Sequence, residues 1–177
     1  MGDPTVAGSQ PANSSLAPSS GGADDSLAQL SDFLEIDDLS RQYARVLLAL
    51  FIGCADDIVG EFYRKIQKSA IGSYIADDAI ERLIPKQKAH WMALFNSDFG
   101  RDYVQSVRRI GIQHRDIALS PSWYVAGYVK LKLELMQRIA ALDVSTDKKI
   151  CLMLTLEKYV AIDMALALTP YDSVILD

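Results

Sequence analysis

Three observations on the 177-residue sequence predict an all-α fold with a single domain. From Ser26 onward, apolar residues recur at steps of three and four, which is the spacing of one helix face. No stretch of useful length alternates apolar and polar residues, and no Asn-Gly or Asp-Gly hairpin turn occurs. Hydrophobic residues make up 50% of the chain, which is enough for a substantial core. We therefore expect six or seven helices packed around one core.

The N-terminal 25 residues are expected to form a disordered tail, and residues 26–168 the helical domain. Gly, Pro, Ala, Ser and Asp dominate the tail, which has no aromatic residue to bury. A short helix is predicted over about 26–34 and a long one over about 37–68, with Gly53 as a point where the long helix could break. The apolar residues that predict its buried face are Val46, Leu47, Leu50, Cys54, Ile58 and Phe62.

Capping residues predict where the next helices begin. Asp77 or Asp78 is expected to cap a helix that ends near Phe95. Pro85 lies inside that helix and predicts a kink, because proline removes a backbone donor and clashes with the preceding turn. A fourth helix is predicted over about 100–119.

The last two helices carry the longest apolar patterns. Ser120-Pro121 predicts an N-cap followed by a first helical residue. The buried face of that helix is predicted to contain Tyr124, Tyr128, Leu131, Leu135, Ile139 and Leu142. A final helix, with Ser145 as its expected cap, reaches about Leu168 and is apolar almost all round. Such a helix needs burial on more than one side. We expect the core on one side and a partner subunit on the other, with residues 169–177 beginning a linker.

Composition excludes several classes of function. A net charge of −5 leaves no basic surplus to neutralise phosphates, so no nucleic-acid partner is expected. No basic residue precedes Arg41, which argues against a secretory signal, and the longest apolar run (46–55) is too short to span a bilayer. We expect a cytoplasmic protein with no membrane partner. Cys54 and Cys151 are interpreted as buried thiols. The absence of C-x-x-C-H excludes covalent c-type haem attachment.

A histidine occupies a predicted core position. Tyr103, Val107, Ile110, His114 and Ile117 follow one another at steps of four and three, so they share one helix face. An unpaired buried polar group costs about 1–3 kcal/mol. His114 therefore has either a hydrogen-bond partner, as an ordinary core histidine, or a metal. Neutral imidazole is the commonest protein metal ligand.

Other chemistries find little support in the sequence. His90 and His114 are the only histidines, and no H-E-x-x-H or paired-cysteine motif is present for zinc. No glycine-rich phosphate loop and no G-x-S-x-G motif occurs. One imidazole on an apolar helix face suits a different use, as the single protein ligand of a haem iron with the sixth position open.

Several segments in order carry a resemblance to a known family. Residues 111–121, Gly-Ile-Gln-His-Arg-Asp-Ile-Ala-Leu-Ser-Pro, followed by Trp123-Tyr124 and Tyr128, resemble the proximal-histidine region of globin-coupled sensors and protoglobins. Residues 61–64, Glu-Phe-Tyr-Arg, resemble the segment with the distal tyrosine. Residues 90–95 resemble the end of the distal helix. The similarity covers about 26–168.

This resemblance implies a globin-like helical sandwich with an extra N-terminal helix, haem b, and reversible binding of dioxygen, CO or NO. It implies His114 as the iron ligand, with Nδ1 donating to a carbonyl near Ile110, and Tyr63 as a donor in the distal pocket. The other residues expected at the cofactor are Leu83, Ile84, Ile110, Ile117, Trp91 and Tyr128. His90 lies in a polar stretch and is not expected to touch iron. Arg108, Arg109 and Arg115 are candidates for the propionates, although charged helix residues are more often simply solvated.

The resemblance also implies partners. Such domains precede an output domain, for instance a diguanylate cyclase, a histidine kinase or a chemotaxis transducer, and we expect a non-enzymatic sensor that forms a homodimer through its last two helices. Two alternatives stay open: a haem-free interaction module, and a stand-alone haem protein with dioxygenase or peroxidase activity. The distal histidine and arginine typical of peroxide cleavage are not visible in the sequence.

Overall fold

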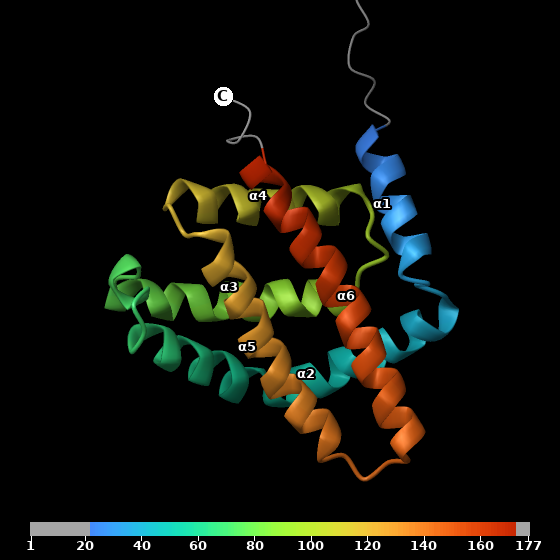
Figure 1. Ribbon diagram of the computed structural model, residues 1–177. Coiled ribbons are helices and arrows are strands. Elements are labelled where there is room, and N and C mark those ends of the chain that lie inside the picture. Colours follow the sequence, from blue (N-terminus) through green and yellow to red (C-terminus); the bar gives the residue numbers. More distant parts are fainter. Residues whose placement is uncertain (1–21, 173–177) are drawn as a thin grey trace, which may run out of the picture.

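Figure 1 shows the computed structural model, in which residues 22–172 are described and form six α-helices and one short 3-10 helix. The elements are α1 (Gly22–Phe33), α2 (Asp38–Gln67), η1 (Gly72–Tyr74), α3 (Asp77–Phe95), α4 (Arg101–Asp116), α5 (Pro121–Ala140) and α6 (Thr146–Asp172). The all-α prediction is confirmed for this part of the chain. None of the described helices is long and apolar enough to cross a membrane.

The helices form two crossed layers. In Figure 1, α2, α3 and α4 extend across the view, and α5 and α6 cross over them. α6 packs most extensively on α4 and also contacts α2 and α5, whereas α3 packs chiefly on α2. α3 and α4 barely touch each other. The fold therefore leaves a gap between two neighbouring helices.

A single apolar core lies between the layers. At its centre, Trp91 of α3 packs on Phe51 of α2 and on Phe95, with ring centroids about 6 Å apart. The predicted face of α5 is confirmed from Tyr124 to Ile139, and Leu142 is half-buried. On α2, Val46 was wrongly assigned to the core. It is 48% exposed, because the neighbouring Leu47 takes the buried position.

Two expectations about helix boundaries need correction, and the kink predicted at Pro85 stays a prediction. α2 continues through Gly53, which faces open space, so the glycine costs only its helix propensity. α3 is capped by Ala76 without a side-chain bond, and Asp77 is its first residue. α3 also continues through Pro85, which is exposed. By contrast, Ser120 accepts from Trp123 N and Ser145 from Lys148 N, as expected of caps.

The first and last helices are longer than expected. α1 begins at Gly22 rather than near Ser26, and α6 runs to Asp172 rather than to Leu168. The rest of the expected tail (1–21) and the end of the expected linker (173–177) lie outside the described residues. Cys54 and Cys151 are half-buried free thiols.

Candidate functional site

A cleft of about 890 Å³ lies between α3 and α4. Lys86 and His90 line it from α3, and Tyr103, Ser106 and Ile110 line it from α4. The cleft exists because α3 rests on α2 while α4 rests on α6, so the two walls belong to different packing units. No group of three or more His, Cys, Asp or Glu side chains within residues 22–172 is arranged to hold a metal ion.

His114 lies one turn beyond Ile110 on α4 and is not among the residues that line the cleft. Its Nδ1 donates to the Ile110 carbonyl at 2.8 Å, which confirms the expected partner. Burial lowers the pKa of His114, the carbonyl bond partly offsets this, and nearby His90 lowers it slightly further. The imidazole is therefore neutral at neutral pH. Because the proton sits on Nδ1, Nε2 carries a lone pair, and it has no hydrogen-bond partner among the described residues.

A capped turn holds the backbone of His114. The amide of Leu119 donates to the His114 carbonyl at 3.0 Å, and the amide of Ala118 donates to Arg115 at 2.8 Å. This is a Schellman motif, and Ala118 takes its left-handed position with φ 58° where glycine is usual. The motif ends α4 at Asp116, earlier than the expected Leu119. Ile117 therefore lies past the helix and is 49% exposed.

Two further contacts tie this turn to the end of α6. Arg115 donates to the Pro170 carbonyl at 3.3 Å, and the Tyr171 hydroxyl donates to the Leu119 carbonyl at 3.1 Å. One turn earlier, a Cβ on Gly111 would lie 2.0 Å from the Ala167 carbonyl oxygen, so α4 and α6 are in backbone contact there. The helix that carries His114 is therefore fixed to α6 on both sides of the histidine.

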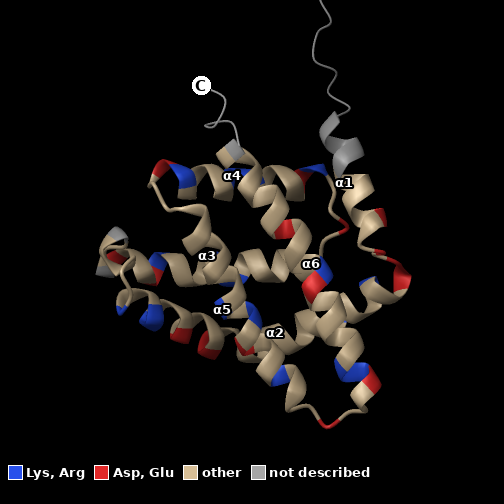
Figure 2. Cartoon of the chain, in the orientation of Figure 1, with Lys and Arg blue, Asp and Glu red and all other residues tan. Residues whose placement is uncertain are grey.

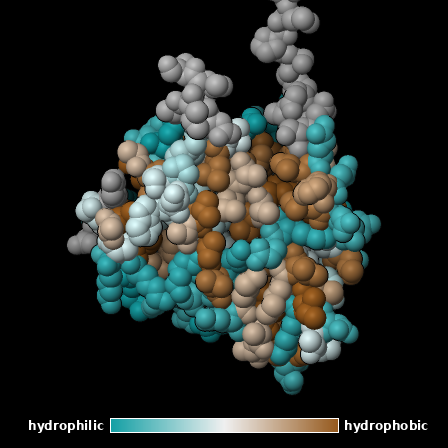
Figure 3. Space-filling view, in the orientation of Figure 1, coloured by the Kyte–Doolittle hydropathy of each residue, from teal (hydrophilic) through white to brown (hydrophobic). Residues whose placement is uncertain are grey.

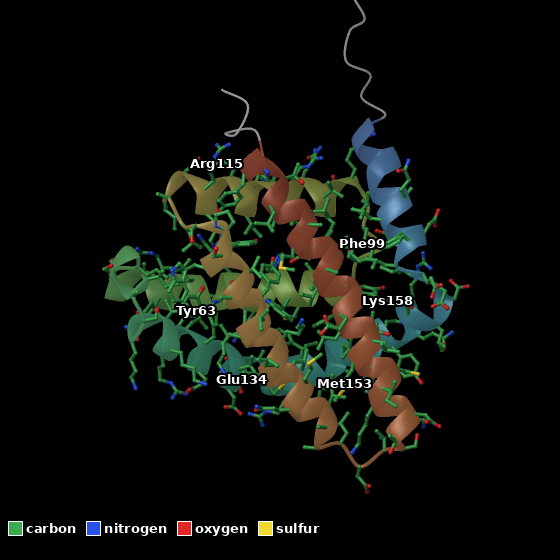
Figure 4. The ribbon with its side chains drawn as sticks, viewed as in Figure 1. Tyr63, Phe99, Arg115, Glu134, Met153 and Lys158 are labelled. Atoms are coloured by element: carbon green, nitrogen blue, oxygen red, sulfur yellow. The ribbon has the colours of Figure 1, made fainter. Side chains whose placement is uncertain are left out.

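Tyr63 is a buried tyrosine near the C-terminal end of α2. In Figure 4, Tyr63 lies at the left of the view and Arg115, the neighbour of His114, at the upper left. Burial raises the pKa of Tyr63 to about 12, so the phenol stays protonated at physiological pH. Its ring packs edge-on against Phe62 at 5.2 Å, and its hydroxyl has no hydrogen-bond partner in the described part of the chain. The side chain is a donor without an acceptor.

The remaining predicted site residues occupy different surroundings. Ile110 lines the cleft, while Leu83 and Ile84 are half-buried on α3 against the core. Trp91 and Tyr128 are buried and pack near each other, 6.3 Å between ring centroids. The buried indole Nε1 of Trp91 has no hydrogen-bond partner among residues 22–172.

The three arginines named as candidates for the propionates also have different surroundings. Arg115 binds Asp116 and Pro170, and the buried Nε of Arg108 has no partner. Arg109 is exposed. At the cleft itself the basic residues are Lys86 and Arg101.

Sequence reasoning missed a buried polar cluster at the inner end of the cleft. Asp163 of α6 has no exposed surface, and it accepts from Tyr103 at 2.5 Å, Tyr128 at 2.6 Å and His90 Nε2 at 2.8 Å. Because His90 and Tyr103 line the cleft, Asp163 lies directly behind them. The signal was available: Asp163 is the single charged residue from Tyr159 to Tyr171 in an otherwise apolar helix. A charge in such a run implies partners on neighbouring helices.

Comparison with known proteins agrees with this geometry. The globin domain of the Geobacter sulfurreducens globin-coupled sensor has a TM-score of 0.75 at 13% identity, with 81% of this chain and 96% of that chain covered. The ferric form of the globin domain of E. coli DosC gives 0.69 at 18% identity, covering 82% and 98%. Its ferrous form gives 0.65 at 17%, covering 80% and 96%. These similarities show a globin fold.

A search of curated protein sequences finds no match. The sequence model of one family, Protoglobin, matches residues 23–174, which is most of the chain and includes every residue of the candidate site. The expected family is confirmed, and the chain belongs to the Protoglobin family.

Proposed function

We propose that the chain is a haem-based gas-sensor domain in which His114 binds the iron of haem b. The observation that carries the proposal is the state of His114: a neutral, half-buried imidazole with Nδ1 bonded to Ile110 and a free Nε2 lone pair. A metal-ligating histidine characteristically donates its other nitrogen in this way. Membership of a globin family implies a haem cofactor and supports the same assignment.

The other groups at the site suit this cofactor. Haem supplies a ferrous iron with one open position for dioxygen, CO or NO, of which dioxygen gains the most negative charge there. Tyr63 offers a protonated, unpaired hydroxyl that would hold a ligand with negative charge more strongly than a neutral one. Leu83, Ile84 and Ile110 would supply apolar walls that exclude water. Ile117, Trp91 and Tyr128 are proposed at the margin, because Ile117 is exposed and the two aromatic residues lie in the core.

The surface of α5 and α6 supports a homodimer. Val129 and Leu133 of α5 and Ile150 and Leu154 of α6 are exposed, Leu154 to 56%. Figure 3 shows apolar side chains over α5 and α6, and Figure 2 shows the charged residues of α6 at its lower end and middle. We propose that α5 and α6 form the dimer interface. On this proposal, a cytoplasmic, non-enzymatic sensor domain passes the ligation state through the end of α6 to an output domain such as a diguanylate cyclase.

The absorption spectrum of the haem-reconstituted protein tests the proposal. We expect a five-coordinate ferrous spectrum in wild type, its loss in His114→Ala, and its recovery when imidazole is added to the variant. An unchanged spectrum in His114→Ala would refute the ligand assignment. Absence of a Soret band in reconstituted wild type would favour a haem-free interaction module. Sustained turnover of NO or peroxide with a reductase would favour an enzyme.

A further inference from the structure

The Asp163 cluster joins four helices at one carboxylate. His90 comes from α3, Tyr103 from α4 and Tyr128 from α5, and all three bind Asp163 of α6. A carboxylate can only accept, so each partner donates its proton to it. Tyr103 binds one oxygen, and Tyr128 and His90 share the other. The arrangement fixes the direction of every hydrogen bond in the cluster.

The cluster extends by one more tyrosine toward His114. Because the Tyr128 proton is committed to Asp163, the Tyr128 oxygen must accept from the Tyr124 hydroxyl, 3.2 Å away. Burial raises the pKa of both tyrosines, and the charge of Asp163 raises it further, so both hydroxyls stay protonated. The result is a directed series from Tyr124 through Tyr128 to Asp163.

The Tyr124 ring forms one wall of the His114 site. It meets the imidazole edge-on, with ring centroids 4.9 Å apart and planes inclined by 70°. His114 is thus restrained twice, by the Ile110 carbonyl at Nδ1 and by the Tyr124 ring at its side. The first restraint lies within α4. The second depends on where the Tyr124 hydroxyl is held, and therefore on Asp163.

We propose that Asp163 is a positioning residue for His114, acting through Tyr128 and Tyr124 to fix the rotation of the imidazole. The proposal rests on the proposed function only in assigning His114 to the iron; the restraint on the ring exists without cofactor. A fully buried charge in an apolar helix is costly to keep, and packing alone would be served by a residue without charge. The hydrogen bonds that Asp163 accepts from residues on three other helices explain why a charged residue occupies this position.

The restraint can be measured in the cofactor-free chain by NMR with carbon-13-labelled histidine. The chain has only two histidines, so His114→Ala assigns both ring signals. We expect Asp163→Asn to shift both signals, because His90 contacts the carboxylate directly. Tyr124→Phe keeps the ring and all three donors of Asp163, so we expect it to shift the His114 signal more than the His90 signal. Thr155→Val, a buried polar site two turns earlier on α6, is the matched control and should shift neither.

Resonance Raman spectra of the haem-loaded variants provide the second readout. The iron–histidine stretching band should shift or broaden in Asp163→Asn and Tyr124→Phe relative to wild type and to Thr155→Val. A folded Asp163→Asn with an unmoved His114 signal overturns the proposal. Should that variant not fold, an unmoved His114 signal in Tyr124→Phe overturns it. A wild-type chain that takes up no haem would refute the proposed function, while the NMR result would still decide the role of Asp163.

Discussion

The surroundings of the two histidines differ in what faces Nε2. At His114, on α4, Nδ1 is bonded within its own helix and Nε2 is free. At His90, on α3, Nε2 donates to Asp163 and lies 3.4 Å from Tyr128. A ligand nitrogen must keep its lone pair, and a nitrogen that donates a proton to a carboxylate has none to offer. The hydrogen bonds therefore leave Nε2 of His114 available to a metal and use Nε2 of His90 to bind Asp163.

Replacing each of the two histidines by alanine is expected to give the largest difference, which is seen in the haem spectrum. We expect His114→Ala to lose the five-coordinate haem spectrum, and His90→Ala to keep it with at most a small band shift. The reason is that His114 has Nε2 free of hydrogen bonds to the described residues, whereas Nε2 of His90 is bonded to Asp163. Absorption spectra of both variants at equal haem loading provide the measurement. Loss of the spectrum in His90→Ala alone would reverse the comparison.

Removing the Tyr63 hydroxyl tests the proposed distal role of this residue. A charge-assisted hydrogen bond contributes about 1.5–3 kcal/mol, or roughly tenfold to a hundredfold in a dissociation constant. We therefore expect Tyr63→Phe to speed dioxygen release by roughly that factor and CO release much less. Stopped-flow or flash-photolysis rates measure both. Small and equal changes for the two gases would mean that Tyr63 is only a core aromatic residue.

Two glycine-to-alanine substitutions test how closely α4, the helix that carries His114, packs on α6. Gly111→Ala places a methyl group 2.0 Å from the Ala167 carbonyl oxygen, so α4 and α6 must separate. We expect it to lower the free energy of unfolding by about 1–3 kcal/mol. Gly53→Ala is the matched control on α2, where the new methyl group meets open space and should stabilise by about 0.5–1 kcal/mol. Urea unfolding of the cofactor-free chain measures both, and equal effects would contradict the close contact.

Lowering the pH tests the burial of His114, and we expect the smallest of the four effects here. Its pKa in the folded protein lies below the unfolded value of about 6.5, so the unfolded chain binds the proton more readily. The free energy of unfolding of the cofactor-free protein should therefore fall as pH drops below about 6.5. His114→Gln should show a shallower fall over the same range, because this proton uptake is absent. Parallel curves for the two proteins would place the imidazole in a less buried setting.

Much of the structure around His114 was predictable because its interactions are local. Ser120 caps α5, the apolar face of α5 is buried, and His114 bonds to a carbonyl four residues earlier. Each depends on residues within one or two helical turns. Predictions failed where two neighbouring residues fit the local apolar pattern equally well. Val46 and Leu47 are both apolar neighbours, and only the packing of α2 on the bundle decides that Leu47 is buried.

The sequence by itself determined the helices, the family pattern and the candidate iron ligand, because helix periodicity and capping are short-range properties. The tertiary structure decided what each histidine can do. Asp163 lies 73 residues from His90 and 60 from Tyr103, and their meeting depends on how four helices pack. Hydrogen-bond direction, burial and the free lone pair at His114 all follow from that packing. The chemistry of the site therefore depends on long-range contacts that no local pattern specifies.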